Sequence, residues 1–162
     1  MPASADHYHL FLSLSVELTG FERVDLEATG LARFYSDKLT ELTGGENTDA
    51  LCAAWQQVEQ GCHGDPDQRI ALTRSLILND QRLGPVARNL LVLWYLGQWY
   101  PLPNWWYTEY GHQPPPGGPP FVIFKPECYT EGLVWPAAGA HPPGAKPFGY
   151  AVWTQPPVEP AI

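Results

Sequence analysis

Hydrophobic positions recur at helical spacing through the first hundred residues, and this pattern predicts five helices. They run over residues 6–19 and 25–42, from a cap at Asn47 or Thr48 to Gly61, over residues 66–77, and from 85 to 97. Asp65 and Pro66 are a strong start signal for the fourth helix, because a capping carboxylate followed by proline suits a helix N-terminus. The fifth helix is apolar nearly all round, which indicates a central position in a bundle.

The helical pattern stops after Tyr100. Residues 101–162 hold 15 of the 18 prolines and four of the seven tryptophans, but only six charged residues. Proline removes backbone donors and fixes φ, so this segment cannot build a regular core of its own. It nevertheless has too many large aromatic residues for a solvated linker. We therefore expect one all-α domain: a small bundle of about five helices over residues 1–100, and an irregular tail over residues 101–162 that wraps the bundle, a partner subunit or both.

The sequence predicts little regular structure within this tail. Residues 101–120 are predicted to form a loop, and residues 121–124 a short strand or a buried extended segment. One short helix is expected between residues 125 and 135, with Pro126 in its first turn. Residues 137–162 are expected to be irregular, with aromatic anchors at Phe148, Tyr150 and Trp153.

Charge and composition exclude several classes of function. The net charge is −8 and no cluster of Lys or Arg occurs, which argues against a nucleic-acid surface. No apolar run approaches the length of a membrane span. The first residues have neither a basic region nor a hydrophobic core of the kind found in export signals.

The three cysteines lack metal-binding spacing, and either one disulfide with a free thiol or three buried thiols would fit the sequence.

Catalytic motifs are also missing from the sequence. There is no glycine-rich nucleotide or flavin cradle and no nucleophile elbow, so we expect no cofactor in this chain. His141 lies between prolines and glycines that restrict its backbone, and Glu127 and Glu131 share one face of the short helix expected in the tail. A small enzyme that uses His141 with Glu127 or Glu131 is therefore an alternative, although a structural or interface histidine and a solvated helix face are the commoner roles.

The aromatic residues near residue 100, where the composition changes, can be interpreted as core residues of the bundle or as anchors of a protein interface. Trp94 and Tyr95 fit the core. Trp105, Trp106 and Tyr107 are adjacent in a proline-flanked segment and cannot easily all face inward, which favours a protein interface for some of them. No catalytic pattern competes with this interpretation, so the sequence favours partner binding over catalysis.

Four short motifs occur in an order and spacing that resemble the small subunit of bacterial membrane-bound, FAD-dependent sugar and polyol dehydrogenases. They are Phe11–Gly20, Leu93–Trp99, Tyr129–Trp135 and Gly139–Lys146. The sorbitol dehydrogenase small-subunit family is the nearest in pattern, and the small subunits of fructose and glucose dehydrogenase complexes are more distant. The resemblance covers about residues 8–153.

This resemblance implies a non-catalytic accessory or chaperone subunit that binds a large FAD-containing dehydrogenase subunit, in a complex that also holds a multi-haem c-type cytochrome. It implies a role in maturation or export and a periplasmic location; without an export signal in this chain, a cytoplasmic location stays open. Some relatives carry a tail cysteine that bridges to the large subunit, but this chain has Ala140 and His141 there, which leaves Cys128 as the tail alternative. The expected partner-binding residues are Trp99, Trp105, Trp106, Tyr107, Tyr129, Trp135, His141 and Trp153.

Overall fold

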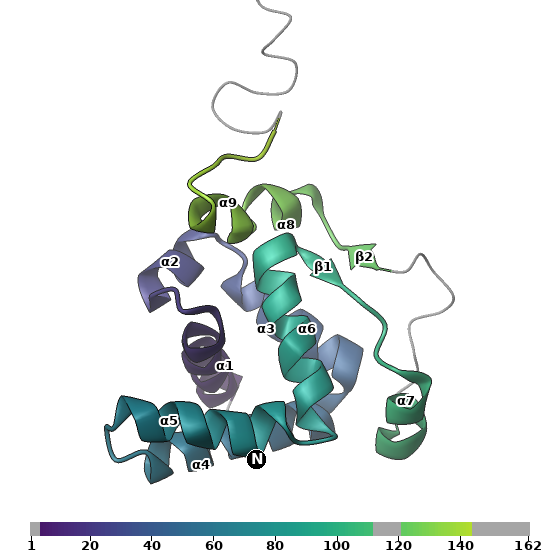
Figure 1. The fold of residues 1–162 in the computed structure, drawn as a ribbon. Coiled ribbons are helices and arrows are strands. Elements are labelled where there is room, and N and C mark those ends of the chain that lie inside the picture. The colour runs from purple at the N-terminus through teal and green to yellow at the C-terminus, as the bar shows by residue number, and fades with distance from the viewer. Residues whose placement is uncertain (1–3, 112–120, 144–162) are drawn as a thin grey trace, which may run out of the picture.

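The computed structural model describes residues 4–111 and 121–143, and it is all-α apart from one pair of two-residue strands (Figure 1). The first six helices are α1 (Ser4–Thr19), α2 (Arg23–Ala28), α3 (Ala32–Thr43), α4 (Gly45–Gly61), α5 (Pro66–Thr73) and α6 (Leu83–Leu96), and a π-helical turn, Arg74–Leu78, continues α5. The predicted helical bundle is confirmed.

The ends of these helices follow local signals. The Asp65 side chain accepts hydrogen bonds from the backbone N–H groups of Asp67 and Gln68, as its position before Pro66 predicts. The helix predicted over residues 25–42 is divided in two, because Gly30 adopts a left-handed conformation with φ of 68° between α2 and α3.

The predicted caps of the third helix are wrong. α4 begins at Gly45, ahead of the expected Asn47 or Thr48. The Asn47 side chain is buried and donates back to the carbonyl of Thr43 at 2.6 Å, while the Thr48 hydroxyl donates to the carbonyl of Gly44. Asn47 and Thr48 therefore lie inside α4, and their side chains bond to carbonyls one turn back instead of capping the start of this helix.

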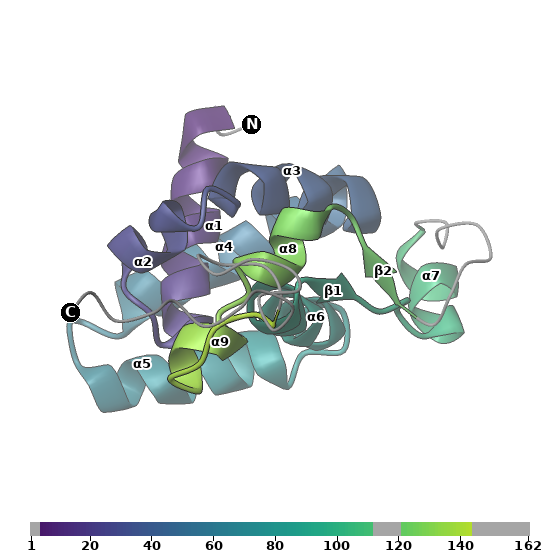
Figure 2. The same ribbon diagram turned by 90° about the horizontal axis from the view of Figure 1, so that it is seen from above.

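The core lies where α1, α3, α4 and α6 meet (Figure 2). Trp94 of α6 stacks on Phe11 at a ring distance of 6.3 Å and meets the edge of Tyr35 at 5.0 Å. All three side chains are buried. The predicted central position of α6 is thus correct, since Trp94 contacts both α1 and α3.

The described part of the tail contains more regular structure than the sequence predicts. β1 (Gln98–Trp99) lies just before the tail, which holds α7 (Asn104–Tyr110), β2 (Val122–Ile123), α8 (Pro126–Thr130) and α9 (Val134–Ala137). The loop expected over residues 101–120 is a wrong prediction where α7 lies. Pro103 precedes this helix, and Gly111 ends it in the left-handed region with φ of 74°. The proline-rich sequence therefore contains both a start signal and a stop signal for α7.

The tail packs on the end of α6. β2 pairs antiparallel with β1, placing Gln98 opposite Ile123 and Trp99 opposite Val122. The N–H of Leu133 donates to the carbonyl of Trp94 at 3.0 Å, which satisfies a backbone acceptor in the last turn of α6. Of the two alternatives predicted for residues 121–124, the structure has the short strand, and the helix predicted with Pro126 in its first turn is present as α8.

The structure contains no disulfide among its three cysteines. Cys52, Cys62 and Cys128 are all free thiols and all buried, so the arrangement with three buried thiols is correct and the one with a disulfide is not. Cys128 lies beneath Gly97 with no exposed surface, so the sequence-based alternative of a disulfide from Cys128 to a partner is wrong for this fold. Within residues 4–111 and 121–143, none of the helices combines the length and apolarity needed to cross a membrane.

Candidate interaction surface

The predicted partner-binding residues fall into two groups. Trp99, Trp106 and Tyr107 are buried within this chain, at 1%, 0% and 7% exposure, and their prediction as surface residues needs correction. Trp105, Tyr129 and His141 are exposed, and Trp135 is half-buried. Trp153 lies outside the described residues, as do Phe148 and Tyr150.

The buried group has specific polar partners. The Trp106 indole N–H donates to the carbonyl of Arg82 at 2.7 Å, and the Tyr107 hydroxyl accepts from the N–H of Leu102 at 3.0 Å. Burial raises the pKa of Tyr107. Because these hydrogen bonds satisfy the polar atoms of rings that fill space against the bundle, the residues attach α7 to the core.

Trp105 differs from its neighbour in direction. Its side chain is 50% exposed, whereas that of Trp106 is fully buried. This difference in exposure is expected for consecutive helical positions, whose side chains point in different directions. Only one of the adjacent tryptophans is therefore available to a partner, in agreement with the expectation that they cannot all face inward.

The strand pair carries a second exposed group. Trp99 faces the core, so the alternation of side chains along a strand turns Gln98 and Tyr100 outward. The antiparallel register turns Ile123 to the same outer face, where it lies opposite Gln98. The rings of Tyr100 and Phe121 meet there at 5.7 Å, and Tyr100 and Ile123 are 39% and 42% exposed.

A third exposed group lies on α8, which contacts β2. The ring of Tyr129 meets the edge of Trp135 at 5.3 Å, and the Trp135 indole N–H donates to the carbonyl of Tyr129 at 2.7 Å. This bond fixes the indole while leaving Tyr129 38% exposed. We call the set Tyr100, Phe121, Ile123, Tyr129 and Trp135 the aromatic surface.

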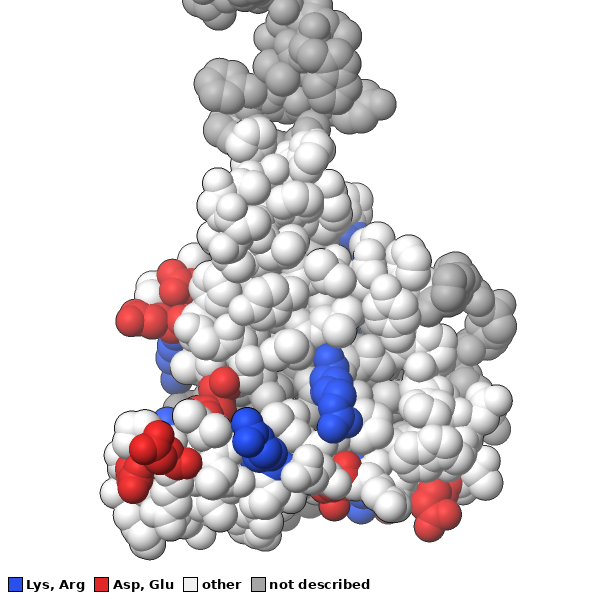
Figure 3. Space-filling view, in the orientation of Figure 1, with Lys and Arg blue, Asp and Glu red and all other residues white. Residues whose placement is uncertain are grey.

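Charge is distributed unevenly over the molecule. In Figure 3 the part of the face that carries α9, α8 and the end of α6 shows almost no charged side chain, whereas charges gather over α2 and α5. Uncharged exposed surface with several aromatic residues is typical of protein contact sites. Tyr100 and Ile123 were missed by the sequence analysis, because their outward direction depends on the pairing of strands distant in the sequence.

A cavity of about 330 Å³ lies between α2 and the segment that includes α8 and α9. His141 and Glu131 both line it, together with Asp25 and the ring of Trp135, whereas Glu127 does not. The structure therefore brings His141 together with one of the two glutamates considered for catalysis. Asp25 was missed because α2 is far away in the sequence, and no local signal places it beside the tail.

The polar groups of this cavity also have structural roles. An Asp25 carboxylate oxygen accepts the N–H of Glu22 at 3.2 Å, within a capping box at the start of α2. Glu131 accepts from the Thr130 hydroxyl at 3.5 Å. Among the described residues, no group of three or more His, Cys, Asp or Glu side chains is arranged to hold a metal ion. The cavity thus combines carboxylates, an imidazole and aromatic walls.

Comparison with protein-family models, with curated proteins and with solved structures finds no match for this chain.

Proposed function

We propose that this chain is a non-catalytic accessory subunit that binds and stabilises the FAD-containing catalytic subunit of a sugar or polyol dehydrogenase complex. The class of partner rests on the four sequence motifs that resemble dehydrogenase small subunits. The single observation that carries partner binding is the aromatic surface, which lies along the strand pair, α8 and α9, together with the exposed ring of Trp105. In this proposal FAD is bound by the partner, and the cytochrome is reached through the partner.

The chemistry of the surface supports a protein partner. Trp and Tyr side chains bury much apolar area at a low cost in side-chain entropy, and they are enriched among residues that dominate binding energy. The scarcity of charge on the adjoining face fits a contact in which few ions must lose their hydration. A partner that fits this surface presents a largely uncharged, apolar face of its own.

Affinity purification of the tagged chain from its own host, under mild conditions, tests this proposal. We expect a yellow complex with a flavin spectrum and a large co-purifying protein in fixed ratio. Trp105→Ala and Tyr129→Ala are expected to reduce the amount of co-purified flavoprotein. Val24→Ala is the matched control, because Val24 is apolar and 63% exposed on α2, outside the aromatic surface. A well-folded chain that elutes colourless and without a partner would contradict the proposal.

A second candidate function is catalysis by His141 with Glu131, favoured by their presence in one cavity. Such a pair could move a proton to or from a small substrate. His141→Ala, measured in the intact complex, separates the two candidates: unchanged turnover excludes a chemical role for the imidazole. Glu127→Ala is the control for a change in charge nearby, since Glu127 is exposed and does not line the cavity.

A further inference from the structure

A second cavity, of about 530 Å³, lies between α1, the helix formed by α5 with its π turn, and α6. It shares no residue with the aromatic surface or with the His141 cavity. Four aliphatic side chains and three charged ones line it, together with Thr73 and Asn79. The aliphatic residues are Leu18, Ile70, Leu78 and Leu91, and the charged ones are Glu17, Arg74 and Arg88. We call it the arginine groove.

The π turn shapes one wall of the groove. The N–H of Asn79 donates to the carbonyl of Arg74 at 2.9 Å, five residues back. This wider turn places Arg74 one turn away from Leu78 and Asn79, and all three line the groove. Single π turns within helices are rare and occur frequently at functional sites.

Arg88 connects the two walls. Its Nη2 donates to the carbonyl of Leu78 at 2.6 Å, which holds the guanidinium of an α6 residue against the π turn. A guanidinium has five N–H donors, so this bond leaves others for a further acceptor. Arg88 is therefore positioned by the fold while keeping capacity to bind an anion.

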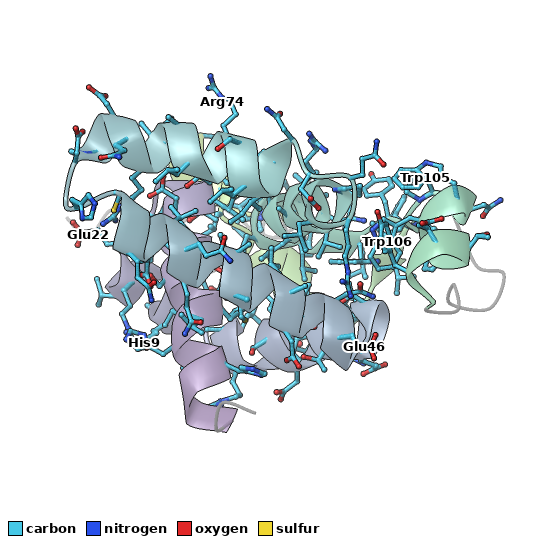
Figure 4. The ribbon with its side chains drawn as sticks, turned by 90° about the horizontal axis from the view of Figure 1, so that it is seen from below. His9, Glu22, Glu46, Arg74, Trp105 and Trp106 are labelled. Atoms are coloured by element: carbon cyan, nitrogen blue, oxygen red, sulfur yellow. The ribbon has the colours of Figure 1, made fainter. Side chains whose placement is uncertain are left out.

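Arg74 lies at the rim and projects away from the bundle (Figure 4). Its guanidinium makes no hydrogen bond or ion pair with any other residue that the structure describes. Its replacement is therefore not expected to disturb the fold, which makes it the more informative of the two arginines to test.

The floor of the groove contains an unsatisfied polar group. Thr73 is 5% exposed, and its hydroxyl has no hydrogen-bond partner within the described part of the chain. A helical threonine ordinarily bonds to a carbonyl in the preceding turn. A buried hydroxyl without a partner costs free energy, and an acceptor that enters the groove beside it would lower this cost.

From these features we propose that the arginine groove binds a small monoanionic amphiphile: a carboxylate attached to an aliphatic chain. Two arginines and one glutamate give the lining a formal charge of one positive unit, which a single negative charge balances. Guanidinium groups bind carboxylates through paired, charge-assisted hydrogen bonds. The four aliphatic residues provide apolar surface for the chain of the ligand, and the volume suits a small molecule.

The test uses n-octanoate as the probe and isothermal titration calorimetry of the full chain, with 1-octanol as the uncharged comparator. We expect saturable octanoate binding at one site and much weaker binding of octanol. Arg74→Gln should lower octanoate affinity by about tenfold or more, as loss of a charge-assisted hydrogen bond predicts. Arg74→Lys should restore part of it, because the positive charge returns.

Arg33→Gln is the matched control, because Arg33 is an exposed arginine whose guanidinium lies over the Tyr8 ring, away from the groove. Circular dichroism of each variant checks that it is folded. The proposal is overturned if octanoate does not bind, if octanol binds as well as octanoate, or if Arg74→Gln and Arg33→Gln have the same effect. None of these results bears on the flavoprotein partner, whose capture is measured separately.

Discussion

Trp94 donates its indole N–H to the hydroxyl of Ser15 across 3.0 Å, with both side chains buried. The Ser15 hydroxyl in turn donates to the carbonyl of Phe11 at 2.8 Å, so a short chain of polar groups crosses the core from α6 to α1. Hydrogen bonds of this kind fix how two helices are rotated relative to one another, because a change in rotation would leave a buried donor unpaired.

Ser15→Ala removes the acceptor of the Trp94 indole. We expect the free energy of unfolding to fall by about 1–3 kcal/mol, the cost of leaving a buried donor without a partner. Urea unfolding followed by tryptophan fluorescence measures this change. Ser13→Ala is the matched control in the same helix, because the Ser13 hydroxyl bonds to the exposed carboxylate of Glu59. Equal effects of the two substitutions would contradict the assigned role of Ser15.

Gly97→Ala should be among the most damaging single substitutions. Gly97 has φ of 68°, and an added Cβ would clash with the carbonyl of Cys128. Gly20 ends α1 with φ of 74° and has nothing within 4 Å of such a Cβ. Gly20→Ala should therefore cost about 1 kcal/mol from backbone strain alone, and Gly97→Ala several kcal/mol more. Thermal unfolding of both variants tests the difference, and a similar loss in both would show that the tail can move away.

Substitution of Trp106 should affect stability, whereas substitution of Trp105 should affect partner binding. Trp106→Ala should lower the free energy of unfolding by about 3–5 kcal/mol, because it empties a fully buried site and removes the bond to Arg82. Trp105→Ala should change it by less than about 1 kcal/mol and act instead on partner binding. Chemical denaturation combined with co-purification measures both properties. A large loss of stability in Trp105→Ala would place its ring in the core.

Stability should decline at alkaline pH. Burial, followed by the charge of Asp49, raises the pKa of Cys52 from 9.0 to about 11. The folded state therefore holds this proton more tightly than the unfolded state, so the stabilising contribution is complete below pH 9 and is lost as pH rises toward 11. The loss amounts to about 2–3 kcal/mol. Burial and nearby Cys128 also raise the pKa of Tyr35, which extends the decline to higher pH.

Urea unfolding at several values of pH from neutral to alkaline measures this slope. Cys52→Ala should make the decline shallower between pH 9 and 11, because the titrating thiol is gone. The same slope in the variant and the parent chain would assign the alkaline sensitivity to other groups.

The bundle could be predicted because its signals are local. Gly20, Gly44 and Asp65 act on the residues next to them, and amphipathic spacing needs no knowledge of tertiary contacts. α7 is not predicted from the sequence although Pro103 and Gly111 mark its ends, because the many prolines around them favour a loop. The composition of the whole tail thus hides the local start and stop signals of this seven-residue helix.

The candidate surface was only partly predictable. Exposure of Trp105 and Tyr129 agrees with the residues chosen from the sequence, but Trp99 and Trp106 are buried. The Trp106 indole bonds to the carbonyl of Arg82, which is distant in the sequence. Which face of β1 is outward depends on its pairing with β2, across residues that include α7. Likewise, Asp25 joins His141 at one cavity through packing of α2 against the tail. Such contacts have no signature in local spacing.

The bond from Leu133 to the Trp94 carbonyl, with β2 on β1, has a consequence for synthesis on the ribosome. α6 leaves the ribosome before the residues that pack on its end, so the carbonyl of Trp94 lacks its Leu133 partner and β1 lacks its paired strand until residues 122–133 emerge. At roughly 5–20 residues per second this interval lasts a few seconds. During it the nascent chain presents an unpaired strand edge and an open helix end that it later closes itself, and a chaperone that binds unpaired backbone has its opportunity then.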